Sequence, residues 1–299
     1  MRVMLLAYTQ MNPGLAEQSV EGSDVRFLLA QGHEQFASHL IEFAGRVCYR
    51  STEKQGGAPG FIAARIHEGH EDIIEHCSAT FLIEGISRAA SHQLVRHRLA
   101  SYSQESQRYT DLSRIIQAED EVVVTPPAIA ANPETHARFT KAMQDLEEAY
   151  RELRDLGIRK EDSRFLLPNA ATTRLIVSMN FRAWRHFLWL RCDKAAQWEI
   201  RAVAYEILRQ LYPLSPAVFQ DVYNTFLIAE DTRQQEAALG VTQTATDCAC
   251  FRPVENRLCD PTSEVWQASE IFICSQYLTS TWRRRSADAR MASATTAAR

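Results

Sequence analysis

The sequence has no long hydrophobic run. No stretch reaches the roughly 18 uninterrupted apolar residues that a membrane helix needs. The apolar run at the N-terminus, within MRVMLLAY, is too short for a signal peptide. We therefore expect no membrane partner, a cytoplasmic location and a buried strand at residues 3–8.

The sequence also lacks an excess of positive charge. It has 33 Lys and Arg against 37 Asp and Glu, a formal net charge of -4. Domains that bind nucleic acid through bulk electrostatics are usually basic overall. We expect no nucleic-acid partner, although a local basic pocket is compatible with this balance.

Cysteine pairs of the Cys-x-x-Cys type are absent. The seven cysteines are an odd number scattered through a long chain, which is typical of reduced thiols in the cytosol and not of a disulfide framework. Cys248, Cys250 and Cys259 could be read as zinc ligands, but their spacing favours unpaired thiols, so no metal site is expected. Cys192 is interpreted as a small structural residue and not as a nucleophile.

The residues that are present suit a folded protein with a sizeable core, because 45% of the 299 residues are hydrophobic. Alternating or apolar runs predict strands, and apolar residues three or four apart predict helices. The predicted strands are 3–8, 78–86, 120–125 and 173–179. The predicted helices are 33–49, 60–68, 88–98, 134–156, 181–190 and 195–211.

Three local signals refine these predictions. Ser87 and Asn180 are expected to cap the helices that follow them. The helix at 134–156 has an apolar stripe that we expect to pack against another helix, in the same chain or in a partner subunit. Residues 285–299 are rich in Ala, Ser, Thr and Arg without an apolar period, and we expect them to be disordered.

One polar segment, residues 96–108, concentrates reactive side chains. It contains three arginines, one histidine, three serines and two glutamines, with only Leu99 and Ala100 as apolar members. Guanidinium groups and hydroxyls suit a phosphate group, so the segment predicts a site for a small phosphorylated ligand. The alternative is a solvated basic face that pairs with acidic neighbours.

This segment resembles the signature of the flavin-dependent thymidylate synthase family, which is Arg-His-Arg, seven residues, Ser. Arg96-His97-Arg98 followed by Ser106 meets that pattern without a gap, and the match continues through Tyr109. Further elements occur in the family's order and approximate spacing. They are Gly69 to His76, Gly85 to Arg88 with Gln93, Arg164 with Leu167-Pro168, Asn180-x-Arg182, Leu190-Arg191 and Ala196 to Ile200.

The resemblance implies an α+β fold with a central β-sheet flanked by helices. It also implies an enzyme that methylates dUMP to dTMP, with methylenetetrahydrofolate as the one-carbon donor and NADPH-reduced FAD as the hydride source. Homotetramers are expected, with each active site drawing on several chains. The resemblance covers residues 1–222, which we take as the catalytic domain, and leaves 223–299 as a C-terminal extension without an assigned role.

The resemblance also assigns residues. Arg191 is the expected catalytic residue, because a fixed guanidinium stabilises the negative charge that forms when N3 of the uracil ionises. The residues expected to bind dUMP are Gln93, Leu94, Val95, Arg96, Gln104, Glu105, Ser106, Gln107, Arg108, Arg164 and Arg191, with Arg164 donated by a neighbouring subunit. The residues expected to bind FAD are Asp72, Arg96, His97, Arg98, Gln104, Asn180, Phe181, Arg182 and His186.

The chain departs from the family at two of these positions. Asp72 stands where the family often has Ser or Thr, and Glu105 stands at a position that is often apolar. A carboxylate beside a phosphate site would repel it, so we expect Glu105 to point away or to pair with Arg98 or Arg108. Two other functions stay open: a flavoprotein that binds nucleotides without methyl transfer, and a non-enzymatic phosphate-binding module.

The remaining aromatic and histidine clusters have less specific interpretations. Trp184, Phe187 and Trp189 follow helical spacing in part, which favours a core or a subunit interface over a stacking platform. His70 and His76 are six residues apart, whereas two metal ligands on one helical face are four apart. We expect them to line the flavin pocket or to cap local structure.

Overall fold

The computed structural model describes residues 1–15, 22–110, 122–228 and 230. The strands are β1 (Arg2–Tyr8), β2 (Ser78–Ser87), β3 (Ser101–Gln104) and β4 (Thr172–Asn180). The α-helices are α1 (Val25–Leu29), α2 (Phe36–Val47), α3 (Ala58–His67), α4 (Arg88–Leu94), α6 (Pro127–Ala130), α7 (Pro133–Asp155), α8 (Lys160–Ser163), α9 (Phe181–Arg191), α10 (Trp198–Leu211) and α11 (Pro216–Phe226). Short 3-10 helices are η1 (Pro13–Leu15), η2 (Thr52–Lys54), η3 (Glu71–His76), η5 (Arg164–Leu166) and η6 (Tyr212–Leu214).

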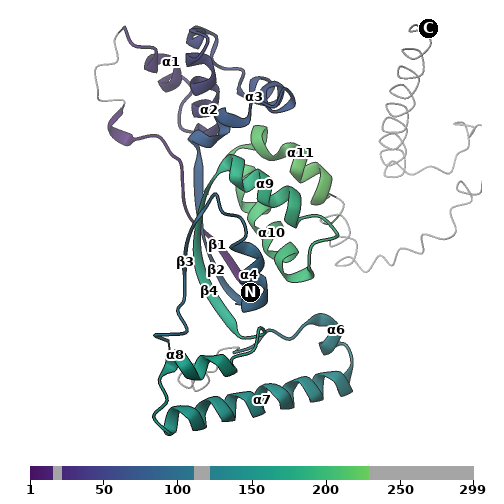
Figure 1. Cartoon of the computed structure of the whole chain (residues 1–299). Helices are drawn as coiled ribbons and strands as arrows, with labels where there is room; N and C mark the ends of the chain where they lie inside the picture. Colours follow the sequence, from purple (N-terminus) through teal and green to yellow (C-terminus); the bar gives the residue numbers. More distant parts are fainter. Residues whose placement is uncertain (16–21, 111–121, 229, 231–299) are drawn as a thin grey trace, which may run out of the picture. The chain divides into compact units, whose positions relative to one another are not determined.

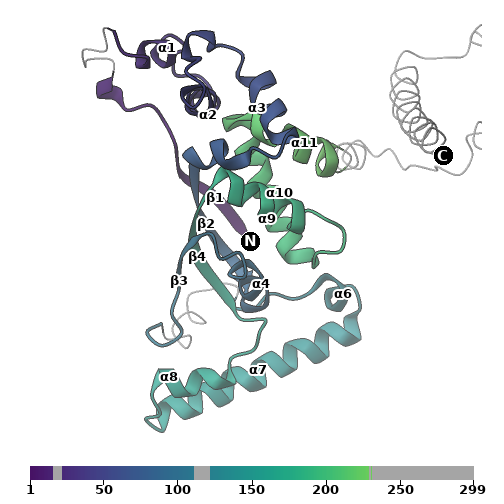
Figure 2. The same ribbon diagram turned by 45° about the horizontal axis from the view of Figure 1, so that its top comes forward.

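The strands form one antiparallel sheet in the order β1-β2-β4-β3. Helices α4, α9 and α10 pack on one face of it, as Figures 1 and 2 show. Burial alternates along β4, because successive side chains point to opposite faces of the sheet: Leu175 and Val177 are buried, whereas Arg174 and Ile176 are exposed. The expected α+β fold with a flanked central sheet is therefore confirmed.

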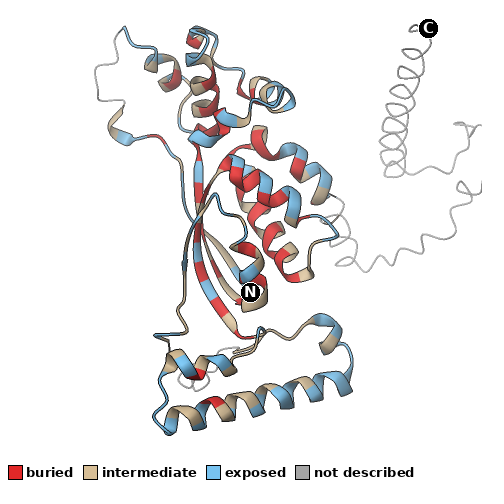
Figure 3. Ribbon diagram, viewed as in Figure 1, coloured by how far each residue is buried: buried red, intermediate tan, exposed pale blue. Residues whose placement is uncertain are grey.

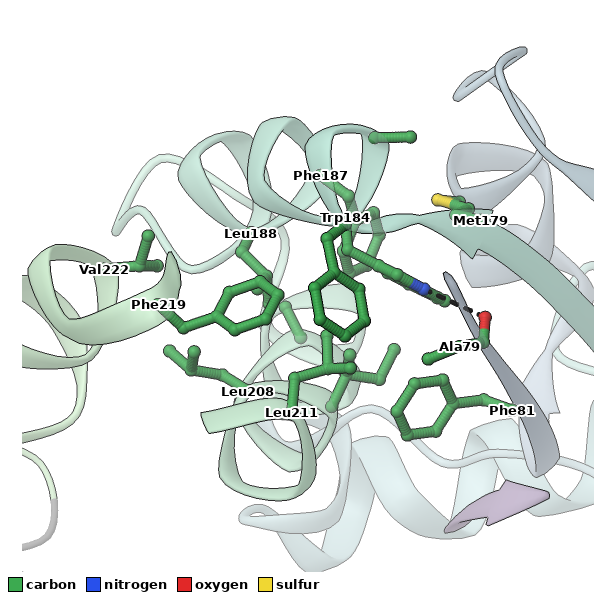
Figure 4. Packing of buried hydrophobic residues seen from close by; sticks show 14 of the residues in the cluster. Ala79, Phe81, Met179, Trp184, Phe187, Leu188, Leu208, Leu211, Phe219 and Val222 are labelled. Carbon is green, nitrogen blue, oxygen red and sulfur yellow. Dashed lines mark hydrogen bonds between the residues drawn. The ribbon is translucent and has the colours of Figure 1, made fainter. Parts of the chain in front are cut away.

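The core lies between the sheet and helices α9, α10 and α11, where the buried residues of Figure 3 gather. Trp184 is fully buried at its centre, with its ring 5.2 Å from that of Phe81 and 5.6 Å from that of Phe187. Its indole nitrogen donates a hydrogen bond to the Ala79 carbonyl at 3.1 Å, which fixes α9 against β2 (Figure 4). The interpretation of Trp184 and Phe187 as core residues is confirmed.

A bulge interrupts β2 shortly before α4 begins. The register of β2 against β4 shifts between Glu84 and Ile86, and Gly85 between them has a φ of 69°. A positive φ is accessible to glycine at little cost. The bulge leads directly to Ser87, whose hydroxyl accepts a hydrogen bond from the Ala90 amide and starts α4, as expected from the sequence.

Two predicted elements differ from the structure. The helix expected at 88–98 ends at Leu94, so the following residues are free to leave the helix axis. The strand expected at 120–125 is wrong: residues 120 and 121 lie outside the described residues, and Val123 makes only an isolated bridge with Ala171. The predicted domain boundary at 222/223 lies within α11, and the expected disorder of 285–299 concerns residues outside those described.

None of the helices in the described part of the chain has both the length and the apolar character needed to cross a bilayer. The long helix α7 has only Tyr150 buried. It contacts α6, α8 and η5 at the end of the sheet where β4 begins (Figure 1). Within the described part of the chain, the helices that meet the expectation for its apolar stripe are therefore short ones.

Candidate functional site

A cleft of about 1190 Å³ lies beside α9. Residues of α9 and of the segment that follows α4 line it. The residues that line it are Glu71, Glu75, Arg96, His97, Arg98, Leu99, Met179, Asn180, Arg182, Ala183, Arg185, His186, Trp189, Leu190 and Arg191. The set includes six of the nine residues expected to bind FAD and the expected catalytic arginine. The sequence motifs around positions 96, 180 and 191 therefore meet at one place.

Helix α9 supplies one wall because its two faces differ. Asn180 caps it by accepting a hydrogen bond from the Ala183 amide at 2.8 Å, as expected from the sequence. Arg182 and His186 are exposed and line the cleft, whereas Phe181 is fully buried and packs edge-on to the Phe219 ring. Phe181 is therefore held in the core and does not line the cleft.

Residues 96–98, which follow α4, contribute two more cationic side chains to the cleft. The side chains of Arg96 and Arg98 are exposed and make no hydrogen bond or ion pair with any described residue. Guanidinium groups without a protein partner are available to bind an anionic ligand. Both residues line the cleft, so this wall can receive phosphate oxygens.

Acidic residues of η3 balance the charge at one end of the cleft. Arg182 donates to the Glu75 carboxylate at 2.6 Å and lies 3.7 Å from that of Glu71. The hydrogen bond with Glu75 is the largest influence on Arg182 and raises the pKa of its guanidinium. Sequence analysis did not identify Glu71 or Glu75 as site residues.

Arg191, the last residue of α9, is held by two contacts at the C-terminus of α4. Its Nε donates to Nε2 of His97 at 3.1 Å, and its Nη2 lies 3.4 Å from the Gln93 carbonyl oxygen. A histidine nitrogen that accepts a hydrogen bond carries no proton, so the proton of a neutral His97 is on Nδ1. The neutral imidazole thus fixes the direction of the Arg191 guanidinium.

The surroundings keep His97 neutral. Burial, then the positive charge of Arg191, then His186 lower the pKa of His97 to about 4. Protonation would remove the lone pair that accepts from Arg191 and would place a second cation beside it. The contact is therefore expected to persist at neutral pH and to fail in acid.

The lowered pKa of His97 can be tested by titration. An unfolded chain protonates His97 near pH 6.5 and the folded chain near pH 4, so the unfolded state binds more protons within that window. Folding stability contributed by the neutral ring is complete above about pH 6.5 and is lost as the pH falls toward 4. Histidine ring signals followed by NMR, with His97→Gln identifying the resonance, should show no protonation midpoint for His97 above pH 5. A midpoint near 6.5 would contradict the assignment.

Arg108 and Arg164, two other residues expected to bind dUMP, lie near the start of β4. Arg108 is 3.2 Å from the Glu161 carboxylate, and Arg164 donates through Nε to the Glu161 carbonyl at 3.1 Å. Arg88 is close by: burial, followed by the charge of Arg164, lowers its pKa, while Glu105 acts in the opposite direction. A second cluster of cations therefore surrounds the start of β4.

Glu105 does not pair as expected from the sequence. Its carboxylate lies 3.6 Å from Arg174 of β4, and its amide donates to the Arg174 carbonyl at 3.0 Å. The expected partners, Arg98 and Arg108, are replaced because the edge strand β3 pairs with β4 and brings these two residues side by side. Glu105 thus has Arg174 as its ion-pair partner among the described residues.

The remaining expected residues have varied surroundings. Leu94 is fully buried, Val95 is half-buried, and Gln104 donates to the Thr173 hydroxyl at 3.2 Å. Ser106 and Gln107 are half-buried in the turn after β3, and Asp72 is exposed on η3. None of these six residues lines the cleft.

The two clusters are distinct but are linked through α4. Arg174, beside Glu105, and Asn180, in the cleft wall, are six residues apart on the continuous strand β4, which corresponds to roughly 20 Å at a rise of about 3.3 Å per residue. Arg88, at the start of α4, is close to Arg164, and Gln93, near the end of the same helix, contacts Arg191.

A buried carboxylate positions α4, and sequence analysis did not assign it a role. Glu199 of α10 is 4% exposed and accepts hydrogen bonds of 2.6 Å from both the amide and the hydroxyl of Ser87. Ser87 in turn caps α4, which carries the Gln93 carbonyl to Arg191. The signal in the sequence was its place in the motif from Ala196 to Ile200.

The second prediction tests this carboxylate. Glu199→Ala should lower the free energy of unfolding by about 2 kcal/mol, because it leaves the Ser87 amide and hydroxyl buried without a partner. Glu199→Gln keeps one acceptor and should cost less. The control is Glu206→Ala on the same helix, which removes a partly exposed pair with Arg209 and should cost below about 1 kcal/mol. Equal denaturation midpoints for Glu199→Ala and Glu206→Ala would refute the role.

Thiols contribute little to this site. Cys77 and Cys192 are buried, and burial raises the pKa of each to about 12, so both stay protonated. This agrees with the interpretation of Cys192 as structural. Cys248, Cys250 and Cys259 lie outside the described residues.

Three comparisons with known proteins extend these observations. The family model described as "Thymidylate synthase complementing protein" matches residues 17–217. A flavin-dependent thymidylate synthase of Geobacter sulfurreducens is 46% identical over 189 residues, which cover 60% of this chain and 80% of that protein. A protein of the same name from Nitratidesulfovibrio vulgaris is 49% identical over 175 residues, 56% of this chain and 68% of that protein.

A solved structure has a similar fold. It is thymidylate synthase X from Helicobacter pylori, determined with FAD and dUMP, and it aligns with a TM-score of 0.56 at 23% sequence identity. The alignment covers 74% of this chain and 99% of that one. At this identity the likeness concerns the fold.

Proposed function

Because the chain belongs to the flavin-dependent thymidylate synthase family, we propose that it converts dUMP to dTMP, with FAD bound in the cleft beside α9. The observation that carries the proposal is the convergence of Arg96, Arg98, Arg182 and Arg191 on that cleft. The one-carbon donor is methylenetetrahydrofolate. The chemistry that bound FAD supplies is a hydride, obtained from NADPH, which turns the transferred methylene group into a methyl group.

The donor set of the cleft fits FAD. Arg96 and Arg98, which have no ion-pair partner among the described residues, offer guanidinium groups to the pyrophosphate, and Asn180 and His186 offer smaller polar groups to ring edges. His97 is held neutral and therefore adds no charge to the cleft near Arg191. Asp72, Gln104 and Phe181 do not line the cleft of this chain, and their assignment to FAD stays a prediction from the resemblance.

Arg191 is the residue that we assign to catalysis. When N3 of the uracil ionises, the ring gains negative charge, and a guanidinium fixed beforehand can stabilise that charge without reorganising. The hydrogen bonds of Arg191 to His97 and to the Gln93 carbonyl supply that fixed geometry. A neutral His97 is essential to it, because a protonated ring would repel the guanidinium.

The site is proposed to be shared between copies of the chain in a homotetramer. Arg96 and Arg191 line the cleft, whereas Arg108 and Arg164 do not line it and contact Glu161. The proposal follows the family resemblance, in which the Arg164 of a neighbouring chain completes the dUMP site. Symmetric oligomers commonly assemble such sites between subunits.

A cytoplasmic location is part of the proposal. Its support is the odd number of cysteines in the sequence and the free thiols of Cys48, Cys77 and Cys192. Residues 223–226 complete α11, and we propose that the part of the C-terminal extension that follows α11 is not required for the reaction. Activity of a chain that ends after α11 would test this.

The experiment that tests flavin binding is the absorption spectrum of the purified protein. The protein should be yellow, or should become yellow with added FAD, and NADPH should bleach the flavin. A colourless protein that cannot be loaded with FAD would refute both this function and the alternative of a flavoprotein without methyl transfer. It would leave the phosphate-binding module as the better description of the polar segment.

A further inference from the structure

Trp189 is the one large aromatic side chain that lines the cleft among the described residues. It is 39% exposed, whereas Trp184 and Phe187 on the same helix are fully buried. Large aromatic side chains are usually buried to a greater extent in a folded chain, and an exposed one inside a cleft points to a ligand or a partner. Trp189 therefore differs from the core residues of α9.

The indole of Trp189 is held by one contact that leaves room for another. Its ring centroid lies 5.3 Å from that of Phe226 on α11, with an angle of 71° between the ring planes. An edge-to-face contact of this kind occupies at most one face of the indole. The side chain is thus supported by Phe226 and retains a flat surface for a second ring.

The neighbours of Trp189 suit a ligand that has both phosphates and flat rings. Arg182, His186 and Trp189 are spaced four and three residues apart, so they lie on one face of α9, and all three line the cleft. Arg182 is about 10 Å from Trp189 along the helix axis. Cations and an aromatic surface therefore follow each other along one wall.

We propose that Trp189 is an aromatic platform on which one flat ring of FAD, the isoalloxazine or the adenine, stacks in the cleft. This inference rests on the proposed function, because it takes the cleft as the FAD site. It also revises the interpretation of Trp189 from the sequence, in which core or subunit interface was favoured over stacking.

Calorimetric titration of the full-length apoprotein tests the proposal. Trp189→Ala should weaken FAD binding roughly tenfold, the range in which stacking between a base and an aromatic side chain is measured by alanine substitution. Trp189→Phe should restore most of the affinity, because phenylalanine keeps a flat ring. Titrations with FMN and ADP identify the ring. If Trp189→Ala loses affinity for FMN but not for ADP, the ring is the isoalloxazine. If it loses affinity for ADP but not for FMN, the ring is the adenine.

Tyr49→Ala provides the matched control, since Tyr49 is 64% exposed and does not line the cleft. It should leave the FAD affinity unchanged. Unchanged FAD affinity in Trp189→Ala would overturn the proposal, and a simultaneous change in sedimentation would assign the indole to a contact between copies of the chain. If the unaltered protein bound no FAD, the proposed function itself would fail, and this inference with it.

Discussion

Replacing Arg191 with alanine is expected to leave FAD bound and to lower dTMP formation roughly a hundredfold or more, the usual cost of losing one transition-state donor. The guanidinium is fixed at 3.1 Å from His97 and has its second contact at the Gln93 carbonyl. Because uracil N3 gains charge only as the reaction proceeds, the loss should appear mainly in kcat and less in the KM for dUMP.

Two further variants are compared with Arg191→Ala. Arg191→Lys keeps the positive charge but loses the planar fork, and it should recover only part of the rate. Arg26→Ala removes an exposed arginine of α1 that does not line the cleft, and its turnover should equal that of the unaltered protein. Turnover near normal in Arg191→Ala, with FAD bound, would remove Arg191 from the catalytic role.

Mixing two impaired variants should restore part of the activity if each site is shared between chains. Arg164→Ala and Arg191→Ala should each be impaired, Arg164→Ala by at least roughly tenfold through loss of a charged hydrogen bond. In a hybrid assembly, one site receives Arg164 from one variant and Arg191 from the other. Random mixing should recover roughly a quarter of normal activity, because a site needs an intact Arg191 from one chain and an intact Arg164 from another, and each is intact in half of the chains.

Co-production of the two variants with different affinity tags isolates the hybrids. Their dTMP formation is then compared with that of each parent variant. Hybrids that form but are no more active than the parents would show that Arg164 does not complete the site of a neighbouring chain.

The sequence predicted the elements whose pattern is local. The strands at 3–8, 78–86 and 173–179 and the helix at 134–156 agree in position with β1, β2, β4 and α7. The expectation that the strand at 3–8 is buried is wrong, because β1 is an edge strand and none of its residues is buried. The strand β3 was missed because its residues, Ser-Tyr-Ser-Gln, have no apolar alternation and pair only at the edge of β4. The apolar run at 120–125 predicted a strand, but among its described residues, 122–125, only Val123 makes a bridge.

The candidate site shows the same division between local and distant information. The motifs identified Arg96, His97, Arg98, Arg182 and Arg191, which the fold brings to one cleft. Distant contacts could not be predicted from spacing.

The pairing of Glu105 with Arg174 depends on the sheet register, and that of Arg182 with Glu75 joins α9 to η3. The Glu199 carboxylate meets Ser87 across 112 positions of the sequence. Such contacts depend on tertiary packing, which no local pattern specifies.

The most direct test of the account is dTMP formation by the purified, FAD-loaded protein supplied with dUMP, methylenetetrahydrofolate and NADPH. We expect dTMP to appear in step with NADPH consumption, and to be absent when either dUMP or methylenetetrahydrofolate is omitted. Oxidation of NADPH without dTMP, from a protein that holds FAD and dUMP, would contradict the proposed function and favour a flavoprotein without methyl transfer.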